Sequence, residues 1–151
     1  MLYESRLFNQ DIGEWDVSSV KSMIYMFYKA YSFNQPIGEW NVSSVENMRH
    51  MFYKSSFNQP IGEWDVSSVE SMALMFYDDK IINQPIGEWN VSNVKDMNNM
   101  FGWAADFNQD LSQWCVSLIK TEPKEFDMGA GAWTEPRPVW GTCPPRVEDG
   151  S

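Results

Sequence analysis

The sequence predicts an α/β solenoid of about five 25-residue strand-helix repeats over residues 1–120, followed by an extended C-terminal tail over residues 121–151. Three observations lead to this prediction. A segment close to FNQPIGEW recurs along the chain, a short apolar alternation follows it, and apolar residues three and four apart come next. A unit of this length cannot bury its own apolar face, so neighbouring copies must stack and share one core.

The recurring segment sets the register of the copies. Its first residue falls at Phe8, Phe33, Phe57, Ile82 and Phe107. A tryptophan follows in step at Trp15, Trp40, Trp64, Trp89 and Trp114. A valine follows each tryptophan two residues later, so equivalent side chains should form columns along the stack.

The first part of each copy predicts a short strand. Ile12, Trp15 and Val17 have the spacing of the L-x-x-L-x-L signature of leucine-rich repeats, in which a strand alternates inward and outward side chains. The predicted solenoid is therefore leucine-rich-repeat-like, with strands near residues 14–18, 39–43, 63–67 and 88–92. Trp and Val should point inward.

The second part of each copy predicts a helix of about ten residues. Apolar residues recur at i, i+3, i+7 and i+10, as at Val20, Met23, Phe27 and Ala30. The patterns Ser43-x-x-Glu46 and Ser67-x-x-Glu70 match the capping box of a helix N-terminus.

An asparagine holds one place in all five copies, at Asn9, Asn34, Asn58, Asn83 and Asn108. We expect a ladder in which each side-chain amide hydrogen-bonds loop backbone that stacking would otherwise leave buried and unpaired. A catalytic role is disfavoured because the neighbours of the asparagine are the same in every copy.

The two ends depart from the repeat. Residues 1–5 align with residues 26–30, so the sequence opens inside the last part of an earlier unit, which favours a longer array. Residues 121–151 hold five of the eight prolines together with Trp133 and Trp140. Such a tail either lies along the end of the solenoid or docks elsewhere, and the two tryptophans are candidate partner-binding residues.

The charge and the residue inventory exclude several function classes. Eleven Lys and Arg against 21 Asp and Glu give a net charge of −10, which disfavours nucleic acid and anionic lipid as partners. No apolar stretch is long enough for a membrane-spanning helix. His50 is the one histidine and reads as an exposed helix residue, so we expect no catalytic residues, no metal site and no cofactor.

The outward face of the predicted strands is the main candidate binding surface. Two columns of polar residues are expected there: Glu14, Glu39, Glu63 and Glu88, with Asp16, Asn41, Asp65 and Asn90 beside them. These columns could recruit a protein with a basic surface patch, or could hold divalent cations loosely. The alternative is a solvated face whose charge provides solubility and prevents sideways aggregation.

Cys115 and Cys143 are the two cysteines. A disulfide between them would fold the tail back over the open end of the solenoid, whereas a reducing compartment would leave two free thiols. The sequence leaves both alternatives open because it does not show the geometry that a disulfide requires.

The unit that begins FNQPIGEW and runs on through MFYK resembles the repeat of bacterial surface proteins and lipoproteins grouped with the BspA-like leucine-rich repeats, which also occurs in unicellular algae. The resemblance covers residues 1 to about 120. It implies a non-catalytic, protein-binding module at the cell surface or outside the cell. The alternative is an accessory structural subunit of a large assembly, in an organelle compartment, docked through its tail.

Overall fold

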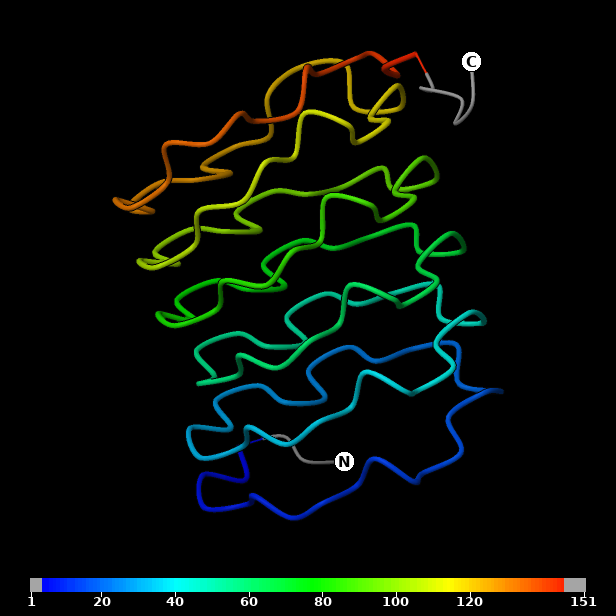
Figure 1. Ribbon diagram of the computed structural model, residues 1–151, viewed down its shortest axis with the longest axis vertical. Helices are drawn as coiled ribbons and strands as arrows, with labels where there is room; N and C mark the ends of the chain where they lie inside the picture. Colours follow the sequence, from blue (N-terminus) through cyan, green and yellow to red (C-terminus); the bar gives the residue numbers. More distant parts are fainter. Residues whose placement is uncertain (1–3, 146–151) are drawn as a thin grey trace, which may run out of the picture.

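The protein is a stack of coils, with one coil for each sequence repeat (Figure 1). The structure is a computed structural model and describes residues 4–145. Successive coils lie on one another along the long axis, so that the first described coil (blue) and the last (red) lie at opposite ends of the stack (Figure 1). Because the coils are stacked in a single row, each coil contacts only the coils directly before and after it.

The predicted strand-helix architecture is wrong. Residues 4–145 contain no helix and no strand longer than one bridged residue. Parallel bridges join Ser22 to Asn47, Asn47 to Ser71, and Ser71 to Asp96, and these positions lie outside the predicted strands. The chain is therefore not an α/β leucine-rich-repeat-like solenoid.

Backbone hydrogen bonds explain why the predicted helices do not form. The Phe27 N–H donates to the Met51 carbonyl in the next coil at 2.8 Å, whereas the Met26 N–H donates three residues back to Met23 at 3.2 Å. Later coils repeat this alternation; the Phe52 N–H, for example, donates to Met75 in the coil beyond. In an α-helix every N–H would bond four residues back within its own segment. Each segment is instead a run of overlapping turns joined to the following coil.

Two positions in each run have a positive φ, which no α-helix allows. In the first complete coil these are Tyr25, with φ 61°, and Lys29, with φ 54°. The equivalent residues in the next three coils are His50 and Lys54, Leu74 and Asp78, and Asn99 and Trp103. A positive φ at the third residue of a four-residue turn defines type II, in which glycine or asparagine is usual. Among these eight residues only Asn99 is a glycine or an asparagine, so the residue types at these positions do not indicate type II turns.

The apolar spacing that resembled a helix is produced by the turns. Met23, Met26, Phe27 and Ala30 are all buried, and their equivalents in later coils are buried too. The phenylalanines stack in a column, with ring centroids 5.4 Å apart for Phe27 and Phe52 and 5.6 Å apart for Phe52 and Phe76. A spacing of three and four residues therefore identified the core face correctly but not the backbone conformation.

The tryptophans form a second internal column. Trp40, Trp64, Trp89 and Trp114 are 0–4% exposed, as predicted for inward side chains, whereas Trp15 in the first coil is 49% exposed. Each buried indole N–H donates to an isoleucine carbonyl in the preceding coil; the Trp64 Nε1 lies 3.1 Å from the Ile37 oxygen. Stacking of the coils thus buries the indole ring and also provides a hydrogen-bond acceptor for its N–H group.

The predicted asparagine ladder is confirmed. The Oδ1 atom of each asparagine accepts a hydrogen bond from the backbone N–H of the asparagine in the next coil. The four distances lie between 2.8 and 3.0 Å. The ladder extends beyond the last asparagine, because the Thr134 N–H donates to Asn108 at 2.8 Å.

Residues 121–145, the described part of the expected tail, stack on the fifth repeat as a sixth coil (Figure 1). The Phe101 N–H donates to the Phe126 carbonyl at 2.9 Å, as phenylalanines do in earlier coils. The segment WTEPRPVW, residues 133–140, then lies where FNQPIGEW lies in a typical copy. The sixth coil is thus a degenerate repeat, and within the segment 133–140 only the proline and the final tryptophan keep their types.

Candidate binding surface

The predicted glutamate column lies on the outside of the stack. Glu14, Glu39, Glu63 and Glu88 are all exposed. Within residues 4–145, none of their carboxylates makes an ion pair or a side-chain hydrogen bond, in contrast to glutamates elsewhere on the chain, such as Glu70 and Lys95 at 3.1 Å. These four carboxylates remain available to a partner.

The neighbouring column of Asp16, Asn41, Asp65 and Asn90 is exposed as well, but it also shapes the backbone. The Asp16 Oδ1 atom accepts hydrogen bonds from the Ser18 N–H at 3.0 Å and the Ser18 hydroxyl at 2.6 Å. The other three residues make the same two bonds with the serine two residues later. An aspartate or an asparagine serves equally well, because the bonded oxygen is common to both.

These bonds also favour the ionised form of the two aspartates. The hydroxyl of Ser18, followed by its backbone N–H, lowers the pKa of Asp16, and Ser67 lowers the pKa of Asp65 in the same way. With the glutamates, the exposed face therefore holds six carboxylates: Glu14, Asp16, Glu39, Glu63, Asp65 and Glu88. We call this set the acidic face.

Another exposed position of successive coils carries charges of both signs: Lys21, Glu46, Glu70 and Lys95. Lys21 and Glu46 lie 3.8 Å apart, and Lys95 and Glu70 lie 3.1 Å apart, across successive coils. Glu46 and Glu70 were predicted to cap helices, and that prediction is wrong because no helix begins there. Their ion pairs distinguish Glu46 and Glu70 from the acidic face, whose carboxylates pair with no lysine or arginine within the described part of the chain.

The two tryptophans predicted as partner-binding residues are used within the chain. Trp133 is 5% exposed, its ring centroid is 4.8 Å from that of Phe107, and its Nε1 atom donates to the Gln109 carbonyl at 3.1 Å. Trp140 is half-buried and contacts Phe126 edge to face at 4.9 Å. Neither ring is displayed as a free anchor.

The two cysteines lie side by side and form a disulfide in the structure. Cys115 belongs to the fifth coil and Cys143 to the sixth, with 28 residues of sequence separation. The bond therefore ties the last described coil to the body of the stack.

The buried carboxylate of Asp79 was not predicted from the sequence. Asp79 is fully buried, and its carboxylate accepts bonds from the Ser55 hydroxyl at 3.0 Å and the Ile82 N–H at 3.2 Å. Burial raises the pKa of Asp79 well above its ordinary value, against the effect of these bonds. The equivalent residues Ala30 and Ala104 are apolar, so a departure within one column is the signal that identifies such a site.

A row of tyrosines lies along another side of the stack. The rings of Tyr28, Tyr53 and Tyr77 stack with centroids 4.9 and 5.0 Å apart. His50 lies between this row and Tyr25, whose ring centroid is 4.7 Å away. The histidine predicted to be exposed on a helix is partly buried, and burial, with a smaller contribution from Arg49, lowers the pKa of His50.

The described part of the chain holds no group of three His, Cys, Asp or Glu side chains arranged to bind a metal ion. Residues 4–145 also contain no helix long and apolar enough to cross a membrane.

Comparison with known proteins places the chain in one family. The family described as "Mycoplasma protein of unknown function, DUF285" matches residues 1–77 and, in a second overlapping match, residues 53–136. No curated protein and no solved structure matches the sequence. Because the two matches together span most of the sequence, this repeat protein belongs to the DUF285 family.

Proposed function

We propose that the protein is a non-catalytic module that binds other proteins, and that the acidic face holds a partner with a basic surface patch. The single observation that carries this proposal is the glutamate column. It places four exposed carboxylates without an ion pair on successive coils of the described chain.

The stack supports this role because it holds the carboxylates on a repeated backbone. Inter-coil hydrogen bonds and the asparagine ladder fix each coil relative to the next. A partner therefore need not order the backbone of the acidic face when it binds, which lowers the entropic cost of association. The net charge of −10 adds long-range attraction for a basic partner.

We place the module at the cell surface or outside the cell. Two observations support this location: the resemblance of the repeat unit to bacterial surface-protein repeats, and the Cys115–Cys143 disulfide, which persists in oxidising compartments. The alternative of a subunit docked through its tail finds no support from Trp133, because that ring is buried in its own chain.

A matched pair of variants tests the acidic face. Glu39→Gln, Glu63→Gln and Glu88→Gln are combined in one chain, and Asp106→Asn, Glu122→Gln and Glu135→Gln are combined in another. All six residues are exposed, and both variants change the net charge by the same amount.

Binding of a poly-lysine probe is measured by titration calorimetry at low and moderate salt. We expect the first variant to weaken binding by about tenfold and the second by about twofold or less. Equal losses in both variants would mean that net charge alone attracts the probe, and the acidic face would then have no special role.

A further inference from the structure

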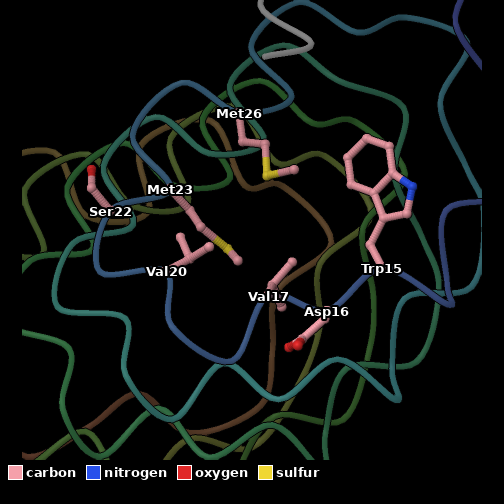
Figure 2. Close-up of a pocket in the computed structure, with 7 residues that line it drawn as sticks. All are labelled: Trp15, Asp16, Val17, Val20, Ser22, Met23 and Met26. Atoms are coloured by element: carbon pink, nitrogen blue, oxygen red, sulfur yellow. The ribbon is translucent and has the colours of Figure 1, made fainter.

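The amino-terminal end of the stack exposes the core columns that the other coils bury. A pocket of about 370 Å³ opens there, lined by Trp15, Asp16, Val17, Val20, Ser22, Met23 and Met26. Figure 2 shows the Trp15 ring and the two methionine side chains around this space. Trp15 is 49% exposed, against 4% for its equivalent Trp40, because no coil within residues 4–145 covers it.

The same end presents polar atoms that are paired in the other coils. The Trp40 indole N–H donates to the Ile12 carbonyl one coil back at 3.0 Å, but the Trp15 indole has no acceptor within residues 4–145. Likewise the Asn47 and Arg49 carbonyls accept bonds from Met23 and Tyr25. Their equivalents Ser22 and Ile24 have carbonyls that accept no backbone bond in the described chain.

The opposite end is closed by a polar pair. In the backbone register of the sixth coil, Asp127 takes the place of Phe101 and Arg137 takes that of Leu111. The Arg137 Nε atom lies 2.9 Å from the Asp127 carboxylate, and the guanidinium covers the Trp133 ring at 4.3 Å. Charged residues thus replace the phenylalanine and isoleucine columns at this end only.

These two ends exclude a second copy as the partner of the open end. A symmetric contact between two open ends would bring carbonyls against carbonyls and leave the Trp15 N–H groups without acceptors. A head-to-tail contact would press the Asp127–Arg137 pair onto an apolar pocket, which buries charge without compensation.

We propose that the open end is a docking surface for one further coil of this same repeat sequence. Such a coil offers backbone N–H groups at alternate positions for the Ser22 and Ile24 carbonyls, as Met23 and Tyr25 do for the next coil. It also offers an isoleucine carbonyl for the Trp15 indole and apolar side chains for the pocket. The proposal extends an interface that already recurs between the coils of the described chain, and it is independent of the acidic face.

A graft tests the proposal on the full chain. Residues 34–50 are copied in front of Met1, so that the added segment continues into residues 1–8 as residues 34–50 continue into residues 51–57. The control carries the same seventeen residues in scrambled order. Both chains are compared with the parent by thermal unfolding and by NMR hydrogen exchange of the Trp15 indole, which is assigned by the loss of its signal in Trp15→Phe.

We expect the graft to raise the unfolding midpoint by about 5 °C or more, and to slow exchange of the Trp15 indole at least about tenfold. The scrambled control should do neither. A graft that performs no better than its control would overturn the proposal. So would a parent chain that is already dimeric with a protected Trp15 indole, because the end would then be a self-association surface.

If the grafted chain is insoluble, a synthetic peptide of residues 34–58 added to the parent chain decides the question. A saturable shift of the Trp15 indole signal supports the docking surface. No shift at about millimolar peptide would overturn it.

Discussion

Asp79 occupies a core position that is alanine at Ala30 and Ala104 and serine at Ser55. Its carboxylate is buried and is bonded by the Ser55 hydroxyl and by backbone N–H groups. Because burial raises the pKa in the folded state, the neutral form favours the fold, and ionisation opposes it.

The stability contribution of Asp79 should therefore depend on pH. It is fully present below the unfolded pKa of 3.8 and is lost as the pH rises through the higher folded value. Urea unfolding from about pH 4 to about pH 8 should show the wild type losing stability relative to Asp79→Asn as the pH rises. The exposed control Asp106→Asn should show no such trend, and a parallel trend in both would show that Asp79 is not the group responsible.

The tryptophan column provides a second prediction for single residues. Trp64→Ala should lower the free energy of unfolding by about 3–5 kcal/mol, because it leaves a cavity and an unpaired Ile37 carbonyl. Trp15→Ala, at the exposed end, should cost about 1 kcal/mol or less. Chemical denaturation measures both, and equal costs would contradict the placement of the column.

At this scale the sequence predicted much of what the structure shows. The buried tryptophans and valines, the asparagine ladder and the exposed glutamates follow from repetition, because identical residues at identical places must have similar surroundings. Asp79 could not be predicted in this way, because repetition describes only what the copies share, whereas this column departs from alanine at Ser55 and Asp79.

The element scale is where the sequence misled. A helix and a run of overlapping turns both bury residues three and four apart, so the spacing at Met23, Phe27 and Ala30 does not distinguish them. Tyr25 and Lys29 have the positive φ of type II turns without being glycine or asparagine. Their conformation depends on hydrogen bonds to the next coil, which local propensity does not encode.

The glycine column is a second case in which the neighbouring coil decides. Gly38 does not have the positive φ that would explain a glycine by its turn conformation. A Cβ atom on residue 38 would lie 2.6 Å from the Pro60 carbonyl oxygen of the next coil. Glycine is needed there because the coils approach closely.

The sixth coil was hidden because few of its residues match the repeat. Its polar pair yields a prediction for the closed end. A double-mutant cycle with Asp127→Ala and Arg137→Ala should give a coupling of about 0.5–1 kcal/mol, since both side chains remain about one-third exposed. A coupling near zero in thermal and urea unfolding would mean that the pair does not hold the last coil in place.

The Cys115–Cys143 bond should act on the same coil. Protein purified without reductant should yield no alkylatable thiol by mass spectrometry. Reduction should lower the free energy of unfolding by about 3–4 kcal/mol, from the loop that the 28-residue separation closes. Two alkylated cysteines in the unreduced protein would contradict the bond, and with it the support for an oxidising compartment.

On the scale of the whole molecule, the chain is a stack of coils with three different surfaces (Figure 1). The acidic face runs along its side, a polar pair closes one end, and an apolar pocket opens the other. The net charge was evident in the sequence, whereas the difference between the two ends of the stack required the register of the sixth coil. The two proposed partners therefore bind at sites that can be tested separately.

The central claim is that turns joined by inter-coil hydrogen bonds, and not helices, build this repeat. Far-ultraviolet circular dichroism of the purified chain tests it most directly. The structure predicts a spectrum without the helical signature, since residues 4–145 contain no helix. A spectrum that indicates a helix content of about a third, as one ten-residue helix in each repeat would produce, would contradict the account.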